Sequence, residues 1–355
     1  MKKPTILLPL LLMAVLAGCG GEAPAEVTVA TTTPATQPPT EATTLPETEP
    51  QPETFTLTFV GDCTLGSTPA NYGADMGFVK VVGQDYDYPF RNVLSYFEND
   101  DGTFANLEGP LTDTGYPVDK KHVFQGATDY VNILLRGSIE AVSLANNHTL
   151  DYGKTGYAST LATLQAAGMP YVERDATALI DLPCGLKVGL YGAVYYYIDR
   201  QDMVTQIQAL RDQGAEVVIV APHWGAEGSY RVSRDQEEIG HAAIDAGADI
   251  VWGSHPHVLQ PMEEYNGGLI LYSMGNFCFG GNCAPKDLDS AIIQQQILRD
   301  PDGTITLGER TVIPCSVGSL ENTNNFQPTP YPEASEGYQR VMEKLTGTYS
   351  KASYW

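Results

Sequence analysis

The segment DIVWGSHPH, residues 249–257, joins a short apolar run to two histidines that flank a proline. An apolar run that ends at a glycine predicts a short buried β-strand followed by a turn. The proline stiffens that turn, and imidazoles two residues apart can serve one metal ion or two adjacent ions.

Five other apolar runs end in this way. They are 55–60 before Gly61-Asp62, 103–105 before Asn106-Leu107-Glu108, 141–145 before Asn146-Asn147-His148, 216–221 before Pro222-His223-Trp224-Gly225, and 269–273 before Met274-Gly275-Asn276. Stretches with helical periodicity, near 157–168, 203–213 and 234–246, lie between the runs. A further strand near 303–308 and a helix near 336–346 are expected beyond them. This alternation predicts an α/β sandwich.

The polar motifs also indicate a metal site. Open α/β sheets bind ligands outside the carboxyl ends of their strands, so neighbouring strands would bring all six motifs to one edge. Four of the chain's six histidines lie in these motifs. One histidine after a strand is best explained as structural, but the combined set favours a borderline divalent metal such as Zn²⁺ or Mn²⁺. The set comprises Asp62, Glu108, Asn147, His148, His223, His255 and His257.

In their order along the chain, these motifs resemble those of CapA-type proteins. This family is associated with poly-γ-glutamate capsule synthesis, and its fold is similar to that of calcineurin-like metallophosphoesterases. The matching signatures cover about residues 55–280 and are Val60-Gly61-Asp62, Asn106-Leu107-Glu108, Ala145-Asn146-Asn147-His148 with Asp151-Tyr152-Gly153, His223-Trp224-Gly225, His255-Pro256-His257 and Tyr272-Ser273-Met274-Gly275-Asn276-Phe277. The resemblance implies a metallophosphoesterase-like sandwich of sheets flanked by helices over residues 55–355, of which 281–355 would be the more variable C-terminal part.

The resemblance also implies a role for each residue. The metal ligands would be Asp62 and His257 at a first ion, Asn147, His223 and His255 at a second, and Glu108 as a bridge between them. His148 would protonate a leaving group or stabilise transition-state charge. Thr64 stands where metallophosphoesterases have a histidine, so the first ion lacks one ligand. The expected cofactor is one tightly held Mn²⁺ or Zn²⁺ ion, with a second ion weakly held or absent.

The N-terminal region predicts export and anchoring. Met1-Lys2-Lys3 precedes thirteen mostly apolar residues, 5–17, which are too few to span a bilayer and are typical of a signal peptide. Leu16-Ala17-Gly18-Cys19 resembles a bacterial lipoprotein processing box, in which Cys19 would be lipidated; an incidental cysteine is the alternative. Residues 20–54 contain seven Pro, ten Thr and no Lys or Arg, which predicts a disordered stalk. We expect an extracytoplasmic protein that is lipid-anchored to the cell membrane.

Charge and cysteine content narrow the possible partners. With 43 acidic and 20 basic residues, the formal net charge of −23 argues against a nucleic-acid-binding protein. The same charge repels other polyanions unless bound metal ions supply local positive charge. Five cysteines remain after Cys19. Cys278 and Cys283 are the closest pair and could form a disulfide, while small buried hydrophobic side chains are the alternative for the others.

Two functions from different classes fit the sequence. The first is a surface-anchored, metal-dependent hydrolase or processing factor that acts on an anionic envelope polymer such as poly-γ-glutamate, through a phosphoester or an amide bond. The second is a non-catalytic polymer-binding accessory protein of a capsule synthesis or export complex. His148 favours catalysis, whereas Thr64 favours binding. Lys121 and Asn276 are candidate substrate contacts, and Glu227 is either a partner of a histidine ligand or an exposed loop carboxylate.

Overall fold

The computed structural model describes residues 51–194 and 198–354. The predicted signal peptide, the processing box with Cys19 and most of the predicted stalk therefore lie outside the described residues. Within the two described ranges, no helix combines the length and apolar character that a membrane span requires.

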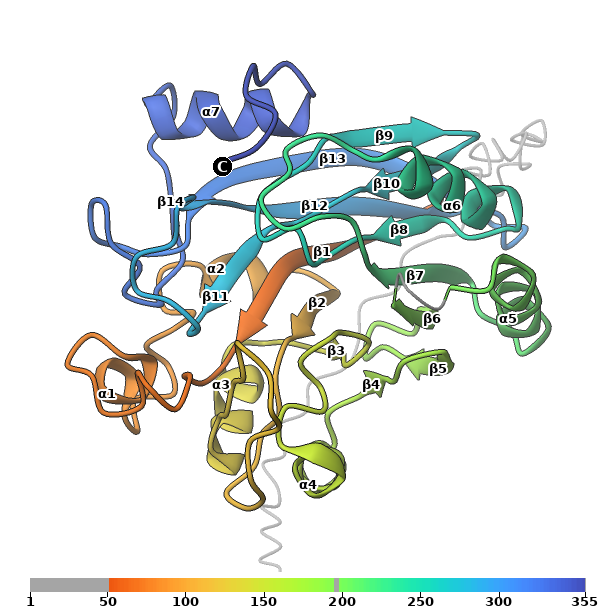
Figure 1. Ribbon diagram of the computed structural model, residues 1–355. Helices are drawn as coiled ribbons and strands as arrows, with labels where there is room; N and C mark the ends of the chain where they lie inside the picture. Colours follow the sequence, from red (N-terminus) through yellow and green to blue (C-terminus); the bar gives the residue numbers. More distant parts are fainter. Residues whose placement is uncertain (1–50, 195–197, 355) are drawn as a thin grey trace, which may run out of the picture. The chain divides into compact units, whose positions relative to one another are not determined.

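The first sheet is built around the long strand β1, Glu53–Thr64 (Figure 1). Among the described residues it has eight strands in the order β14-β13-β12-β1-β2-β3-β4, and β11 also pairs with β1. β1 runs parallel to β2 and β11 and antiparallel to β12. The other strands are β2 (Gly102–Leu107), β3 (Ala141–Ser143), β4 (Tyr171–Val172), β11 (Asn276–Phe279), β12 (Asp289–Arg299), β13 (Ile305–Ser316) and β14 (Thr329–Pro330).

The second sheet comes from the middle of the chain. Its six strands within the described ranges follow the order β5-β6-β7-β8-β10-β9. The four inner strands are parallel, and the two outer strands, β5 and β9, are antiparallel to their neighbours. The bounds are β5 (Ala176–Asp181), β6 (Lys187–Val194), β7 (Val217–His223), β8 (Ile250–Trp252), β9 (Met262–Tyr265) and β10 (Gly268–Leu271).

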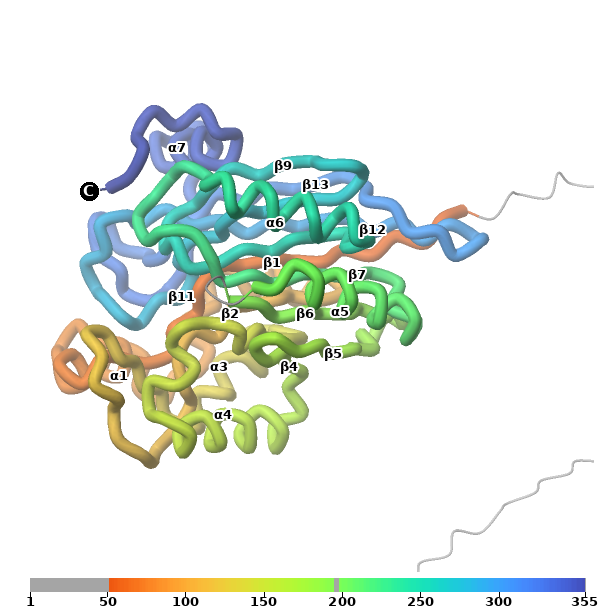
Figure 2. The backbone as a smooth tube through the Cα atoms, turned by 45° about the vertical axis from the view of Figure 1, so that its right-hand side comes forward, coloured from red at the N-terminus to blue at the C-terminus, as the bar shows by residue number. Residues whose placement is uncertain are grey.

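The two sheets pack face to face, and helices cover their outer faces (Figure 2). Helices α1 to α4 and the 3₁₀ turn η1 pack against the first sheet, α5 and α6 pack against the second, and α7 packs on β12 and β13. The bounds are α1 (Phe78–Val82), α2 (Leu94–Phe97), η1 (Thr128–Tyr130), α3 (Val131–Arg136), α4 (Gly153–Ala167), α5 (Arg200–Asp212), α6 (Arg234–Asp245) and α7 (Glu336–Leu345). The predicted class, a sandwich of sheets flanked by helices, is confirmed.

The alternation of residues in β1 explains the central layer. Phe55, Leu57 and Phe59 are buried against the second sheet, whereas Val60 belongs to the core under the helices of the first sheet. Burial of each large apolar side chain contributes about 1.5–3 kcal/mol. Trp252 joins the two sheets, because its indole Nε1 donates a hydrogen bond to the carbonyl oxygen of Val60 at 2.9 Å. The C-terminal end of β1, where Asp62 lies, is thus anchored in the core.

The predicted elements are all present, with shifted ends. Each predicted strand overlaps β1, β2, β3, β7, β8, β10 or β13, and the predicted helices correspond to α4, α5, α6 and α7. β1 begins at Glu53, so the boundary of the predicted stalk at residue 54 is wrong by two residues. The reason is pairing with β12: Glu53 lies opposite Arg299, whose Nε donates to Glu53 Oε2 at 2.7 Å.

The C-terminal part is integral to the first sheet. β12 pairs with β1 over seven residues, and β13 pairs with β12. The five described cysteines are free, so the alternative of a Cys278–Cys283 disulfide is wrong in this structure. Cys278 lies inside β11 in the apolar core, where its Sγ donates to the carbonyl oxygen of Phe326 at 3.7 Å.

Candidate metal centre

The polar motifs meet at one side of the stacked sheets. Asp62 lies in β1, Glu108 follows β2, and Asn147 and His148 follow β3 in the first sheet. His223 ends β7, and the turn with His255 and His257 follows β8 in the second sheet. The sequence predicts the motifs at one edge if their strands are neighbours; these strands instead belong to two sheets, whose carboxyl ends point to the same side.

Glu108 lies at the centre of the group. Its side chain is fully buried, and Oε1 faces three imidazoles. The Nε2 atoms of His223, His257 and His148 lie 3.6, 3.9 and 4.0 Å from Oε1. A carboxylate in this position has the geometry of a shared ligand between two histidine-bearing sites.

Asp62 and His257 form one half of the group. Asn106 Nδ2 donates to Asp62 Oδ1 at 2.8 Å, which turns Asp62 Oδ2 toward His257 Nδ1 at 3.1 Å. Asn276 Oδ1 lies 2.9 Å from the same nitrogen, and Asn276 Nδ2 donates to the carbonyl oxygen of His257. Asp62, Glu108 and His257 each offer one ligand atom within 4.8 Å of the others.

His223, Asn147 and His255 form the other half. His223 Nε2 lies 2.9 Å from Asn147 Oδ1, and His223 Nδ1 is 2.8 Å from the hydroxyl of Ser254. The ring of His255 lies beside that of His223, with 4.6 Å between their centroids. The predicted ligands of the second ion are therefore neighbours.

His148 is held by the motif that follows it. Its Nδ1 is 2.6 Å from Asp151 Oδ2, an acceptor, so we assign the ring proton to Nδ1 and leave Nε2 directed at Glu108. Lys120 Nζ donates to Asp151 Oδ1 at 3.1 Å and to the carbonyl oxygen of Asn147 at 2.8 Å. Phe124 donates its backbone N–H to Asp151 Oδ2 at 2.7 Å. Asp151, itself held by Lys120 and Phe124, thus fixes the orientation of the His148 ring through Nδ1.

Burial sets the protonation of these groups. It lowers the pKa of His223 well below its usual value, lowers that of His255 to about 4, and lowers that of His148. Burial acts in the same direction on His257, but the charges of Glu108 and Asp62 outweigh it and raise its pKa to about 10. Burial and the nearby charge of Asp62 raise the pKa of Glu108. Three imidazoles are therefore neutral near pH 7, the form that binds metals.

The buried oxygens of this group lack hydrogen-bond partners within the described protein. Asp62 Oδ2 and both oxygens of Glu108 form no hydrogen bond, and neither does His255 Nδ1. Buried polar atoms are almost always satisfied, so buried acceptors without a partner that face imidazole nitrogens fit a site for a cation. The donor set, carboxylate oxygen with imidazole nitrogen, is one that Zn²⁺ and Mn²⁺ accept.

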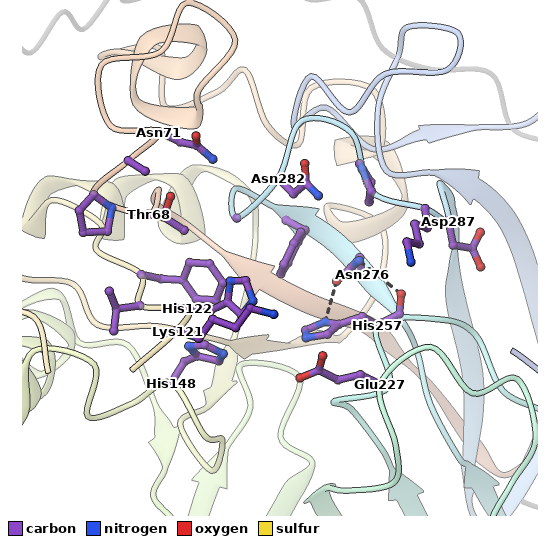
Figure 3. Close-up of a pocket in the computed structure, with 18 of the residues that line it drawn as sticks. Thr68, Asn71, Lys121, His122, His148, Glu227, His257, Asn276, Asn282 and Asp287 are labelled. Carbon is purple, nitrogen blue, oxygen red and sulfur yellow. Dashed lines mark hydrogen bonds between the residues drawn. The ribbon is translucent and has the colours of Figure 1, made fainter. Parts of the chain in front are cut away.

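A cavity of about 730 Å³ opens onto the group (Figure 3). Lys121, His122 and His148 lie on one side of it, and Glu227 and His257 lie on the other. Lys286 and Asp287, from the C-terminal part, and the rings of Phe124 and Phe279 also line it. A cavity of this size can take a segment of polymer rather than only a small ion.

The structure brings together all the residues predicted as ligands, and both predicted substrate contacts line the cavity. Asn276 contacts His257 directly, so it also orients a predicted ligand. Thr64 is buried, and its hydroxyl has no hydrogen-bond partner in the described protein. Trp224 is fully buried, and its Nε1 donates to the carbonyl oxygen of Tyr272, as expected of a packing residue.

Sequence reasoning did not assign roles to several residues of the group. Asp151 stands three residues after His148, a spacing that could have indicated contact. Ser254 is adjacent to His255 in sequence but contacts His223 instead. The sequence around Lys286 gives no sign that this residue lines the cavity. Its position there depends on the pairing of the C-terminal strand β12 with β1.

The sequence is similar to known capsule proteins. The family model described as bacterial capsule synthesis protein PGA_cap matches residues 56–195 and 176–281. Capsule biosynthesis protein CapA of Bacillus anthracis is 30% identical over 330 residues, which cover 84% of this chain and 75% of that protein. PGA biosynthesis protein CapA of Bacillus subtilis (strain 168) is 29% identical over 295 residues, which cover 74% of each chain.

Among solved structures, the chain is similar to the NAD nucleotidase NadN of Haemophilus influenzae, with a TM-score of 0.43 and 12% sequence identity. The match covers 85% of this chain and 65% of the nucleotidase, which is less than two thirds of the latter.

Proposed function

The chain belongs to the PGA_cap family of bacterial capsule synthesis proteins, and from this premise we propose that it is a metal-dependent hydrolase acting on an anionic cell-envelope polymer. Poly-γ-glutamate is the first candidate substrate, since the family is one of capsule and poly-glutamate synthesis. The observation that carries the proposal is the buried carboxylate of Glu108, which three imidazoles surround and which has no hydrogen-bond partner in the described part of the chain.

The proposed ligands divide between two adjacent positions. Asp62 and His257 would hold one divalent cation, Asn147, His223 and His255 would hold the other, and Glu108 would contribute to both. When bound, such a cation lowers the pKa of a water molecule and polarises the bond that is attacked. The hydrogen bond from Asn106 to Asp62 and the contact between Ser254 and His223 orient two of these ligands.

His148 would handle the proton. Asp151 Oδ2 accepts a hydrogen bond from the Nδ1–H of His148 and fixes the ring, so Nε2 faces the interior of the site and the cavity. From there it can donate a proton to a leaving group or a hydrogen bond to developing negative charge. Its lowered pKa means that it must first gain a proton, which the adjacent solvent-connected cavity allows.

The cavity lining supports an anionic substrate. Lys121 and Lys286 present positive charge along a cavity that His257, one of the proposed metal ligands, also lines. A polymer with a carboxylate in every repeat would contact such lysines at more than one position. The two phenylalanines of the lining provide apolar surface for the backbone of the polymer.

We further propose that Cys19 is lipidated and holds the protein at the extracytoplasmic face of the cell membrane. The sequence pattern of residues 1–19 supports this proposal. Two or more acyl chains on one residue make a stable anchor. Residues 20–52 would then connect the anchor to β1.

A second function, binding the polymer without cleaving it, is favoured by one observation. Thr64 offers no imidazole at a position where the resembling phosphoesterases have one, which weakens one ion site. Such a protein would hand nascent polymer to a capsule synthesis or export complex. The presence of His148 and Asp151 in hydrogen-bonding geometry favours the hydrolase.

The test is turnover. Purified full-length protein is loaded with Mn²⁺ or Zn²⁺ and incubated with a generic phosphodiester and with poly-γ-glutamate, and the polymer length is followed by size-exclusion chromatography. We expect metal-dependent cleavage by the wild type and its loss in His148→Ala. Metal-loaded protein that binds the polymer but cleaves neither substrate would refute the hydrolase and leave the binding function.

A further inference from the structure

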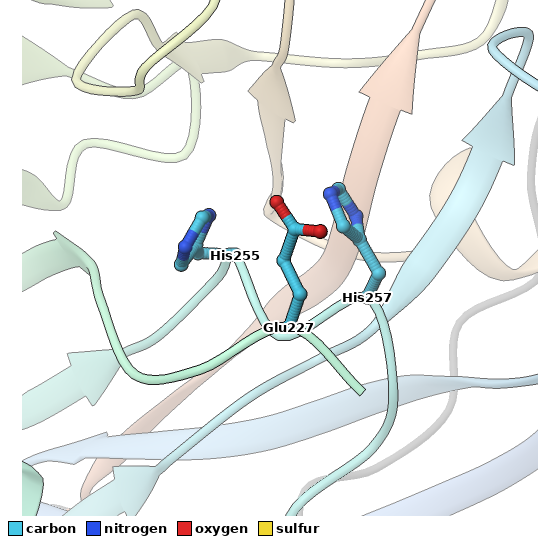
Figure 4. A group of neighbouring side chains, drawn as sticks. All are labelled: Glu227, His255 and His257. Atoms are coloured by element: carbon cyan, nitrogen blue, oxygen red, sulfur yellow. The ribbon is translucent and has the colours of Figure 1, made fainter. Parts of the chain in front are cut away.

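Glu227 lies against the two histidines of the turn after β8 (Figure 4). Its carboxylate is located between the imidazoles of His255 and His257 (Figure 4). One oxygen of Glu227 and one nitrogen of each histidine lie within 4.8 Å of one another. Glu227 therefore lies near one proposed ligand from each half of the metal centre.

The backbone holds Glu227 in this position. Its loop follows β7, and Gly225 and Gly228 on either side have φ angles of 81° and 72°, which favour glycine. Gly228 donates its N–H to the carbonyl oxygen of Pro256 at 2.8 Å, which ties the loop to the histidine turn. The C-terminal segment secures the other side, because Tyr354 donates its N–H to the carbonyl oxygen of Gly228 at 3.1 Å.

The histidine turn shows two independent signs of a ligand-binding site. His255 and His257 have φ angles of 97° and 57°, a region that costs non-glycine residues energy and is concentrated at functional sites. In addition, the buried Nδ1 of His255 has no hydrogen-bond partner in the described protein. The fully buried carboxylate of Glu108, also without a partner, faces His257 from the interior.

Charge balance favours the same conclusion. Asp62 and Glu108 would carry two negative charges once metal binding has displaced their protons, and one divalent cation would neutralise these charges. Glu227 adds a third carboxylate from the cavity side. His257 belongs to both groups of possible ligands, one with Asp62 and Glu108 and one with Glu227 and His255. A third carboxylate raises the affinity for a second cation, because it supplies both a ligand atom and charge compensation.

We propose that Glu227 is a metal ligand, which joins His255 or His257 in binding one of the two divalent cations, such as Mn²⁺ or Zn²⁺, of the proposed centre. The inference rests on the proposed metal centre and extends it by one ligand on the cavity side. Glu227 is exposed and lines the cavity, so its carboxylate lies on the solvent side of the two histidines. This arrangement makes two cations per chain attainable.

The experiment compares metal binding by the full-length wild type with that by Glu227→Gln, which keeps the shape and removes the charge. Glu227→Asp keeps the charge but shortens the side chain, and Glu309→Gln, an exposed position on β13, is the charge-matched control. Each protein is stripped with a chelator and titrated with Mn²⁺ by calorimetry, and its metal content is measured after dialysis. Circular dichroism verifies that each variant is folded.

We expect Glu227→Gln to lower the affinity for at least one ion by about tenfold or more, since even the loss of an outer partner of a ligand costs about 10–100-fold. Glu227→Asp should retain part of the affinity, and Glu309→Gln should match the wild type. Folded Glu227→Gln with wild-type affinity and stoichiometry would overturn this inference alone. Loss of turnover with unchanged metal binding would also overturn it, whereas a wild type that binds neither Mn²⁺ nor Zn²⁺ would overturn the metal centre itself.

Discussion

Replacement of Glu108 by glutamine tests whether this carboxylate is a metal ligand or has only a structural role. Glu108 is fully buried, neither of its oxygens has a hydrogen-bond partner among residues 51–194 and 198–354, and three imidazole nitrogens surround Oε1. If the side chain is there to bind a cation, it destabilises the metal-free protein and stabilises the metal-loaded one. If it is structural, its removal destabilises the protein under both conditions.

The expected magnitudes follow from this environment. Burial of an ion costs several kcal/mol, whereas burial of an unpaired amide costs about 1–3 kcal/mol, so metal-free Glu108→Gln should be at least as stable as the metal-free wild type. A cation at 100 times its Kd adds about 2.7 kcal/mol to the wild type. With an unfolding entropy of about 2.1 cal/mol/K per residue over about 300 residues, this gain raises Tm by about 4 °C.

The assay is thermal unfolding with and without Mn²⁺. Glu309→Gln controls for the loss of one exposed negative charge. We expect the wild type and this control to gain about the same Tm on metal addition, and Glu108→Gln to gain little. A variant that is less stable than the wild type by several degrees without metal, and that keeps the full metal-dependent gain, would refute the assignment of Glu108 as a ligand.

Three further predictions concern other parts of the chain. His223→Ala should lose most of the bound metal in elemental analysis, whereas His148→Ala should keep it and lose about 10²–10⁴ in turnover, the usual range for general acid–base catalysis; equal metal content in wild type and His223→Ala would contradict the ligand set. Cys19→Ser should leave an unlipidated precursor in mass spectrometry, and an acylated, membrane-bound variant would contradict the anchor. The third prediction concerns Asp289, whose burial would raise its pKa, but the Arg340 hydrogen bond and the Lys344 charge outweigh this effect and lower it. A lowered folded-state pKa contributes stability that is present above the ordinary pKa of Asp and lost as pH falls through the folded value. Asp289→Asn should therefore cost about 3–5 kcal/mol at pH 7 and clearly less at pH 3 in urea unfolding, and an equal cost at both pH values would contradict the ion pair.

Much of this fold could be predicted because its strands are short, apolar and followed by polar turns. Phe55, Leu57 and Phe59 all face the second sheet, and this shared burial produces the period-two pattern that residues 55–60 show in the sequence. Helix α4 ends at Gly168, which has the left-handed conformation expected of a glycine C-cap. Local signals of this kind depend on a few neighbouring residues and need no knowledge of long-range contacts.

Long-range pairing could not be predicted in the same way. Nothing in residues 289–299 shows that β12 lies beside β1, so the assignment of strands to two sheets required the structure. The same holds for Glu227, because its neighbours in the sequence indicate only a loop. The hydrogen bond from Gly228 N–H to the carbonyl oxygen of Pro256, which brings this loop to the histidine turn, is visible only in the structure. The motifs indicated which residues carry the chemistry, but the partners that orient them come from distant strands.

Electrostatics connects the metal centre to the polymer. Three carboxylates, Asp62, Glu108 and Glu227, lie around His257, which lines the cavity, and the chain as a whole is strongly acidic. Without bound metal, these carboxylates repel a polyanion. Two divalent cations would make the local charge positive. Metal would then be needed for polymer binding as well as for hydrolysis. Metal dependence of binding is therefore expected of both proposed functions, and only turnover distinguishes them.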